Sequence, residues 1–329
     1  MTRSAKLYRY RLPMDSRFML RNQPMSERVG FIVELVQGSR IGYGEVAPLD
    51  GVSAESIEQA GLQAQRQLEI WACDGEMDYS ELLPSVAFGL SIAELELSGQ
   101  LPQQGNYHTA PLYAGDSESL FSKMNELSQH PIVRIKLGKG EPAREGLLVN
   151  QLLESVPELT LRLDANRAWD LQQAAQFAKP ISPSLRQRIA YVEEPCLHPS
   201  DSVSFAINSG IAIAWDETLL AEVRRPDFAV KDIMGVKTLA LKPSLLGSVE
   251  YCRNLIEQAK ALSVQIVISS SFESSLGLNQ LARLAHWLVP EQIPSLDTAQ
   301  FFTHQLEKPW PNCDLPLQSL HDQEMMWRS

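Results

Sequence analysis

The sequence has few cysteines and no long apolar run. Its four cysteines, Cys73, Cys196, Cys252 and Cys313, lie far apart and form no C-x-x-C pair. This spacing argues against a disulfide framework and favours reduced thiols in a cytoplasmic protein. We expect the thiols to be buried as small hydrophobic groups. The longest weakly polar stretch, residues 82–93, is far shorter than the ~20 residues that span a bilayer, so we expect no membrane partner.

Positive charge is also scarce. The chain has 29 Lys and Arg against 40 Asp and Glu, which gives a formal net charge of −11. It has no dense basic cluster, and this excludes the electrostatic footprint of a nucleic-acid-binding protein. The N-terminus lacks the apolar core of a secretory signal. We therefore expect a cytoplasmic protein with a small-molecule substrate, and the sequence leaves a monomer and a small homo-oligomer equally open.

The length of 329 residues predicts about two domains, because one simple core rarely grows beyond about 250–300 residues. Residues 1–104 mix strand and helix patterns. Alternating or apolar runs predict a small antiparallel sheet from residues 6–12, 29–36 and 41–46. Apolar steps of three and four residues predict helices over residues 57–71 and 84–97. Gly42 and Gly44 precede no nucleotide-binding helix, so we interpret them as strand residues in close backbone contact.

Residues 105–300 alternate short strand-like runs with helical stretches. The runs cover residues 110–113, 133–137, 159–163, 189–192, 211–215, 238–241, 265–268 and, more weakly, 293–296. Eight such units are typical of parallel strands that close into a barrel with helices outside. An open doubly wound sheet is the competing topology, but it would gather the chemistry at one switch point. Residues 301–329 lack this pattern, and we expect them to pack back on the N-terminal domain.

Polar residues follow most of these strand-like runs. They are Lys136, Asp164, Glu193, Asp216, Lys242, Ser269 and Asp297. Active sites of such barrels lie at the carboxyl ends of the strands, so we expect these side chains to converge. The three successive carboxylates Asp164, Glu193 and Asp216 suit Mg²⁺, or alternatively Mn²⁺. A lysine beside a bound cation can act as a general base, which makes Lys136 and Lys242 candidate catalytic residues.

Four further residues are candidates for substrate binding. Arg162 lies two residues before Asp164, on the same strand face but one layer deeper. It would position an anion or brace the metal ligands, and a purely structural ion pair explains it equally well. Asn166 lies just past the strand end, within reach of Lys136 or a ligand. Ser269 and Ser270 offer hydroxyls and amides to a carboxylate near the start of a helix, with capping serines in a turn as the alternative.

These residues resemble the enolase superfamily and, within it, the o-succinylbenzoate synthase family. The resemblance is carried by GYGEVAPLDGVS (42–53), PSVAFGLSIAELEL (84–97), IKLG (135–138), LRLDANRAW (161–169), YVEEPC (191–196), IAIAWDE (211–217), LKPSLLGS (241–248) and ISSSFESSLGL (268–278). It implies an α/β fold, with an N-terminal α+β capping domain over residues 1–104 and a modified TIM barrel of the (β/α)₇β type over 105–300. A C-terminal segment, 301–329, would pack on the capping domain.

The resemblance also implies an activity. Members of this family are carbon–oxygen lyases of menaquinone biosynthesis, which dehydrate 2-succinyl-6-hydroxy-2,4-cyclohexadiene-1-carboxylate to o-succinylbenzoate. It implies Mg²⁺ on the three carboxylates, stabilising an enediolate, and Lys136 as the acid/base. Lys242 would remain charged on the opposite face of the substrate, and Ser269 and Ser270 would hold its succinyl portion or carboxylate.

Two departures and two alternatives accompany this resemblance. Arg134 replaces the first lysine of the family's K-x-K motif; an arginine supports Lys136 electrostatically but cannot be the base. Ser295 replaces a common glycine and would narrow the pocket. Two lysines on opposite faces also suit two-base chemistry, so an N-acylamino acid racemase or dipeptide epimerase stays open. So does a catalytically silent barrel that serves as a binding scaffold.

Overall fold

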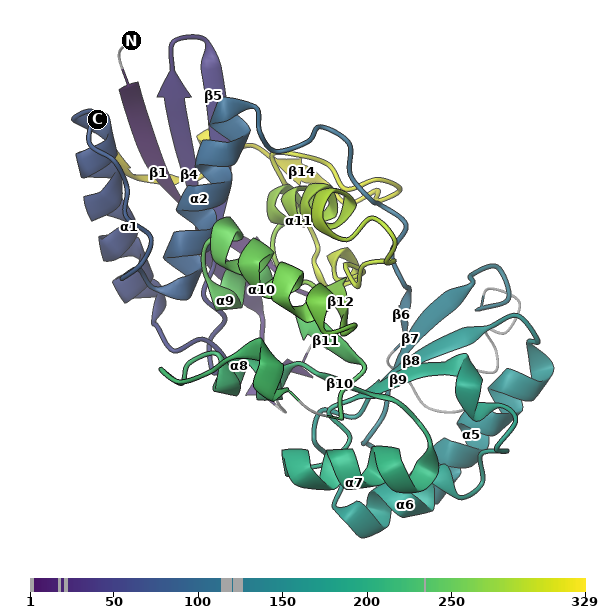
Figure 1. Cartoon of the computed structure of the whole chain (residues 1–329). Helices are drawn as coiled ribbons and strands as arrows, with labels where there is room; N and C mark the ends of the chain where they lie inside the picture. The colour runs from purple at the N-terminus through teal and green to yellow at the C-terminus, as the bar shows by residue number, and fades with distance from the viewer. Residues whose placement is uncertain (1–2, 17–18, 21–22, 114–119, 121–126, 234) are drawn as a thin grey trace. The chain divides into compact units, whose positions relative to one another are not determined.

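The computed structural model describes residues 3–16, 19–20, 23–113, 120, 127–233 and 235–329 (Figure 1). The chain forms two compact units. The first unit consists of residues 1–108, 242–257 and 268–329, and the second consists of residues 109–241 and 258–267. The division into domains at residues 104 and 300, expected from the sequence, stays a prediction.

The first unit contains a four-stranded antiparallel sheet in the order β15-β1-β4-β5. The strands of the first unit, including two separate two-stranded sheets, are β1 (Arg3–Pro13), β2 (Met19–Leu20), β3 (Gln23–Pro24), β4 (Glu27–Gln37), β5 (Arg40–Val46), β13 (Gln305–Leu306), β14 (Leu317–Gln318) and β15 (Glu324–Arg328). Its helices are α1 (Ile57–Ala72), α2 (Pro84–Ser98), α9 (Pro243–Leu246) and α11 (Ser275–Leu288). The helix α10 (Val249–Ala261) begins in this unit. The strands and helices predicted within residues 1–104 are confirmed.

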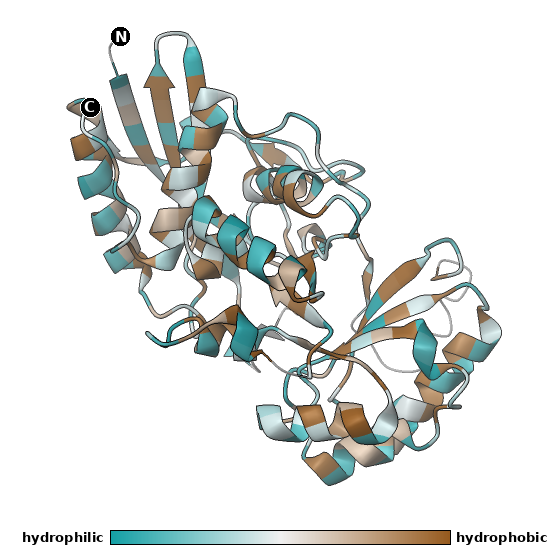
Figure 2. Cartoon of the chain, in the orientation of Figure 1, coloured by the Kyte–Doolittle hydropathy of each residue, from teal (hydrophilic) through white to brown (hydrophobic). Residues whose placement is uncertain are grey.

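Helix α1 shows how local sequence produces this unit. Ser56 caps its start, and the side chain of Gln59 returns a hydrogen bond to the backbone of Ser56, which forms a capping box. The apolar positions spaced by three and four residues are the buried ones, namely Ala60, Ala64, Leu68 and Trp71. Figure 2 shows the resulting mixture of polar and apolar colour along α1. The predicted helical spacing therefore marks the face that packs into the core.

Helix α2 lies unusually close to strand β5. A Cβ atom on Gly44 would lie only 1.8 Å from the carbonyl oxygen of Gly89, and one on Gly42 would lie 2.1 Å from that of Ala93. No side chain larger than hydrogen fits at either position. The close backbone contact predicted for Gly42 and Gly44 is confirmed, and helix packing is its cause.

The second unit is built on a seven-stranded sheet in the order β12-β11-β10-β9-β8-β7-β6. Its strands are β6 (Leu112–Tyr113), β7 (Ile132–Lys136), β8 (Thr160–Asp164), β9 (Ile189–Glu193), β10 (Ile213–Trp215), β11 (Thr238–Leu241) and β12 (Gln265–Ile268). Its helices are α5 (Pro142–Ser155), α6 (Leu171–Ala178), α7 (Pro199–Ser209) and α8 (Glu217–Glu222). The strand pairs from β6 to β11 are parallel.

Seven of the eight predicted strands are confirmed, and the weak eighth is wrong as a strand. Residues 293–296 form only a single parallel bridge, between Ser295 and Ser269. Pro294 lies within this run and has no backbone N–H to donate to a ladder.

The two faces of the central strands carry different chemistry. Val133, Ile135, Leu161 and Leu163 belong to a buried apolar cluster that includes residues of α5 and α6. Because side chains alternate between faces along a strand, the residues between them point to the opposite face. That face is the polar one, and it carries the candidate site.

Two expectations about the whole chain can be compared with the structure. All four cysteines are free; Cys196 and Cys252 are buried as expected, whereas Cys73, at the carboxyl end of α1, is exposed. Cys313 is half-buried. In the described part of the chain, none of the helices has the length and apolar character that crossing a bilayer requires.

Candidate active site

Lys136, Asp164 and Glu193 lie side by side at the carboxyl ends of β7, β8 and β9. Lys136 pairs with Asp164, and Asp164 pairs with Glu193, in parallel register. Asp216 follows β10, two residues beyond Ala214, which itself pairs with Glu193. We name Asp164, Glu193 and Asp216 the carboxylate row. None of the three is more than 1% exposed, so their charges need partners within the protein.

Two cationic side chains reach this row from strand β7. The Nη2 atom of Arg134 donates to Asp164 Oδ2 at 2.5 Å and to Glu193 Oε1 at 2.8 Å. The Nζ atom of Lys136 donates to the same Asp164 oxygen at 2.5 Å and to Asn166 Oδ1 at 2.7 Å. Burial opposes the charge of Arg134, but Glu193 and Asp164 outweigh it and raise the pKa of Arg134 above its ordinary value. The expected contact between Asn166 and Lys136 is present.

A second polar layer lies one step deeper on the same strands. Arg162 pairs in register with Arg134 on one side and with Tyr191 on the other. Its guanidinium carbon lies 5.7 Å from the centre of the Tyr191 ring. Burial raises the pKa of Tyr191 to about 12, although Arg162 opposes this shift. Arg162 thus lies beneath the carboxylate row, as its spacing predicts, and its role in substrate binding stays a prediction.

Glu194 organises the backbone around Asp216. Its carboxylate accepts hydrogen bonds from the amides of Asp216 at 2.9 Å and Thr218 at 2.7 Å, and from Arg167 Nε at 2.9 Å. These bonds hold the backbone of Asp216, the residue directly before α8. The sequence analysis did not predict this role, because nothing in the YVEEP pattern shows which backbone amides the second glutamate reaches.

The carboxylate row has the donor chemistry of a magnesium site. It offers buried oxygen ligands from three adjacent strands, which is the ligand type that Mg²⁺ and Mn²⁺ prefer. As placed, the described residues include no group of three acidic, histidine or cysteine side chains close enough to hold a metal ion. Instead, the Nη2 atom of Arg134 donates to both Asp164 and Glu193. The carboxylate oxygens have the chemistry that a divalent cation requires, and the assignment of these three residues as its ligands stays a prediction.

The other predicted site residues belong to the first unit. Lys242 follows β11 directly, is half-buried and precedes α9. Ser269 follows β12 and is 1% exposed. The hydroxyl of Ser270 lies 2.9 Å from that of Thr298, and its amide donates to the carbonyl of Ser295. These bonds fix the backbone that carries the serines. The convergence of Lys242, Ser269 and Ser270 with Lys136 stays a prediction.

The first unit also buries a carboxylate that the sequence analysis missed. Glu45, on β5, accepts hydrogen bonds from the Tyr10 hydroxyl, from the Ser274 amide at 2.9 Å and from the Ser274 hydroxyl at 2.7 Å. Burial raises the pKa of Glu45, although the Ser274 amide opposes it. Burial and the nearby Glu45 charge raise the pKa of Tyr10 well above its ordinary value.

The buried carboxylate of Glu273 also accepts hydrogen bonds from a serine hydroxyl and a backbone amide. It accepts from the Ser244 hydroxyl at 2.6 Å and from the Ser271 amide at 2.7 Å. We name these two acids and their donors the hydroxyl cluster. It comprises Tyr10, Glu45, Ser244, Ser271, Glu273 and Ser274. The cluster holds the start of α11 immediately after Ser269 and Ser270.

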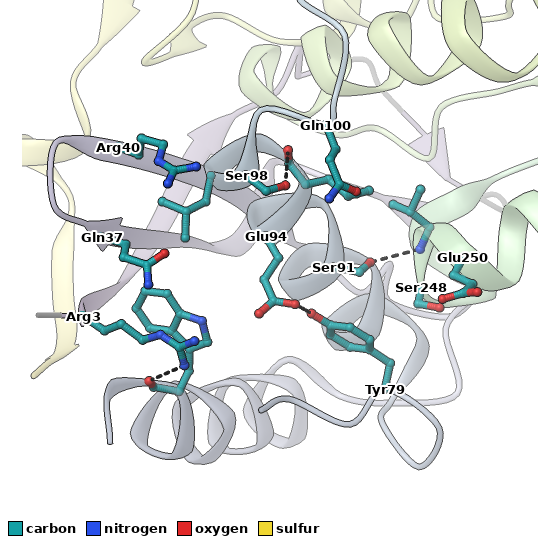
Figure 3. A pocket seen from close by; sticks show the side chains of 14 residues that line it. Arg3, Gln37, Arg40, Tyr79, Ser91, Glu94, Ser98, Gln100, Ser248 and Glu250 are labelled. Carbon is teal, nitrogen blue, oxygen red and sulfur yellow. Dashed lines mark hydrogen bonds between the residues drawn. The ribbon is translucent and has the colours of Figure 1, made fainter. Parts of the chain in front are cut away.

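A pocket of about 370 Å³ lies elsewhere in the first unit (Figure 3). Tyr79 and Glu94 meet in it through a hydrogen bond, and the hydroxyl of Ser91 accepts from the amide of Val249 at 3.0 Å. Among the described residues, its lining contains none of the predicted site residues. Pocket size alone therefore does not locate the candidate active site.

Comparison with known families accounts for both parts of the chain. The family described as "MenC, N-terminal domain" matches residues 2–97, and the family "Enolase C-terminal domain-like" matches residues 120–314. The chain is 55% identical to the o-succinylbenzoate synthase of Vibrio cholerae serotype O1 (strain M66-2) over 327 residues, which cover 99% of this chain and 98% of that protein. It is 50% identical to the o-succinylbenzoate synthase of Aliivibrio fischeri (strain MJ11), over 99% and 100% of the two chains.

Solved structures support the fold. The o-succinylbenzoate synthase from Thermosynechococcus elongatus BP-1, complexed with Mg in its active site, matches with a TM-score of 0.77 at 22% identity, over 90% of this chain and 93% of that one. An L-Ala-D/L-Glu epimerase matches with a TM-score of 0.70 at 17% identity, over 92% and 94%. The predicted fold class, a modified (β/α)₇β TIM barrel with an α+β capping domain, is confirmed.

Proposed function

Because this chain belongs to the o-succinylbenzoate synthase family of the enolase superfamily, we propose that its substrate is 2-succinyl-6-hydroxy-2,4-cyclohexadiene-1-carboxylate. It is an enzyme of the carbon–oxygen lyase class, and the reaction is the syn-dehydration that yields o-succinylbenzoate for menaquinone biosynthesis. The observation that carries the proposal is identity of about half the residues over nearly the whole length, combined with Lys136 placed at the carboxylate row.

Lys136 is the acid/base in this proposal. In its neutral form, Nζ takes the proton from the ring carbon that bears the carboxylate. The resulting ammonium then gives a proton to the hydroxyl that leaves from the same face, so that water departs and the ring becomes aromatic. The hydrogen bond to Asn166 Oδ1 at 2.7 Å helps to orient the amine. A side chain that is 28% exposed can meet a substrate.

The carboxylate row holds the metal in this proposal. Asp164, Glu193 and Asp216 supply the ligand oxygens for Mg²⁺, and Mn²⁺ would serve as a substitute. When bound, the cation supplies the positive charge that stabilises the enediolate formed after proton removal. Glu194 holds the backbone at Asp216 and so keeps that ligand in place.

Five further residues bind and stabilise the substrate in this proposal. Lys242 remains charged and stabilises the enediolate from the opposite face, and Ser269 and Ser270 hold the succinyl portion or its carboxylate. Arg162 and Asn166 complete the substrate contacts. The hydrogen bond from the Ser270 amide to the Ser295 carbonyl at 3.1 Å supports this assignment, because it holds the backbone of the two serines in one position.

The experiment is a direct assay. Purified protein is mixed with the cyclohexadiene substrate and MgCl₂, and loss of diene absorbance is followed. We expect turnover that requires the metal and is abolished in Lys136→Ala. Unchanged absorbance with the native protein, or full turnover in the variant, would refute the proposal.

A second assay, of hydrogen exchange with solvent, tests the alternative activity. A racemase or epimerase exchanges the α-hydrogen of an N-succinyl amino acid with solvent, so deuterium incorporation into both enantiomers at a rate above that of dehydration would favour it. The compartment belongs to the proposal as well. Four free cysteines support a reducing environment, and we place the enzyme in the cytoplasm.

A further inference from the structure

Arg134 occupies a position that the activity alone does not explain. One nitrogen of its guanidinium, Nη2, is shared by two members of the carboxylate row, Asp164 and Glu193. The arginine side chain is 9% exposed, and those of the two acids are 0% and 1% exposed. Acids so deeply buried repel each other unless a positive charge stands between them.

The strand register explains how Arg134 reaches this point. It lies two residues before Lys136 on β7, on the same face, and it pairs with Arg162 one layer below the row. From there its long side chain extends upward to the carboxylates. A guanidinium keeps its charge even when it is buried, so Arg134 supplies a permanent positive charge to the two acids.

A metal ion and Arg134 therefore compete for the same oxygens. The guanidinium bonds to Asp164 Oδ2 and Glu193 Oε1. A divalent cation that binds the same row must take over at least one of these contacts and must tolerate the nearby positive charge. Lys136 also contacts Asp164 Oδ2, but its side chain is more exposed than that of Arg134, 28% against 9%.

We propose that Arg134 is a positioning residue that holds Asp164 and Glu193 together before metal binds and lowers the metal affinity of the site by competing for them. This inference rests on the proposed metal site at the carboxylate row. It goes further, because it states that one arginine both stabilises the metal-free site and lowers its affinity for the metal.

The test measures Mg²⁺ binding and thermal stability rather than turnover. Isothermal calorimetry with MgCl₂ is carried out on EDTA-treated native protein, Arg134→Met and Arg134→Lys. We expect Arg134→Met to bind Mg²⁺ at least about ten-fold more tightly, and Arg134→Lys to stay within about three-fold of the native protein. We also expect Arg134→Met to have a lower Tm without metal and a larger rise in Tm when Mg²⁺ is added.

A matched control removes an exposed cation that is paired with other acids. Arg225 is exposed and pairs with Glu222 and Asp227, so Arg225→Met changes the net charge equally without touching the site. Its Mg²⁺ affinity should equal that of the native protein. A comparable increase in this control would attribute the effect to net charge and would overturn the inference.

The remaining outcomes separate this inference from the proposed function. If the native protein binds Mg²⁺, Asp164→Asn abolishes binding, and Arg134→Met binds no more tightly than the native protein, the inference fails and the metal site stands. If the native protein binds no Mg²⁺, both fail. Should Arg134→Met not fold without metal, refolding with MgCl₂ is expected to restore it, and failure to restore it would also overturn the inference.

Discussion

The carboxylate row of the second unit and the hydroxyl cluster of the first unit both bury acids, but they satisfy them with different partners. Asp164 and Glu193 receive the charged side chains of Arg134 and Lys136. Glu45 receives a tyrosine hydroxyl, a serine hydroxyl and a backbone amide. Charged side chains can move away and be replaced by another cation, whereas an amide at the start of a helix is fixed by the fold. The partner chemistry thus separates a site built for exchange from one built to hold the backbone.

The largest effect that would test this contrast is on turnover. We expect Lys136→Met to lower kcat/KM by about 10²–10⁴-fold, the usual contribution of a general acid/base. The free energy of unfolding should change little, because this lysine is partly exposed. Steady-state assays and urea denaturation of the same preparation measure the two quantities. A stability loss as large as that from an altered hydroxyl cluster would erase the distinction.

Next in size is an effect on stability without an effect on chemistry. Tyr10→Phe removes one of the donors to Glu45 and leaves a buried carboxylate oxygen less well satisfied. We expect a loss of about 1–3 kcal/mol in the free energy of unfolding. Activity at temperatures well below Tm should stay within about three-fold of the native value. Urea denaturation provides the measurement, and an unchanged midpoint would show that the hydroxyl bond contributes nothing.

A somewhat smaller loss is expected when the hydroxyl cluster is crowded rather than depleted. In Gly277→Ala the new Cβ would lie 2.0 Å from Glu45 Oε2 and 2.9 Å from Glu273 Cβ, so both acids must shift. Overpacking of this kind costs about 1–3 kcal/mol, from which the better helix propensity of alanine recovers about 1 kcal/mol. Thermal unfolding should show a lower Tm. A higher Tm would mean that the cluster is adaptable, like the carboxylate row.

The smallest effect concerns pH. The folded-state pKa of Glu45 is raised by burial, so the folded protein takes up this proton at a higher pH than the unfolded chain does. The native protein should therefore gain stability relative to Glu45→Gln as the pH falls from 7 toward 4.5, the ordinary value for a glutamate. Paired urea titrations at several pH values measure this difference. A constant difference across that range would show that Glu45 does not titrate differently in the folded state.

Much of the architecture could be predicted because it depends on local patterns. The strand runs of the barrel and the spacing of α1 each reflect the immediate neighbours along the chain, and Gly42 and Gly44 indicated a close backbone contact without showing that α2 makes it. The alignment of Lys136, Asp164 and Glu193 also follows from position, since each ends a parallel strand. The spacing of apolar residues and the positions of the strand ends were sufficient to predict these features.

What could not be predicted depends on side chains that meet across long stretches of sequence. Glu45 and Ser274 are 229 residues apart, and no pattern in either segment indicates that they pair. Arg134 is an intermediate case. Its place two residues before Lys136 puts it on the correct face, but only the structure shows that its guanidinium lies between two acids.

Strand β15 pairs with β1, with Arg328 opposite Lys6, although β1 precedes it by some three hundred residues in the sequence. A ribosome makes β1 long before β15, so this edge of β1 has no partner until residues 324–328 have been synthesised. An uncovered strand edge is a template for pairing with other chains. Truncation before residue 324 would therefore harm this protein mainly through aggregation, even though every residue of the proposed active site had already been made.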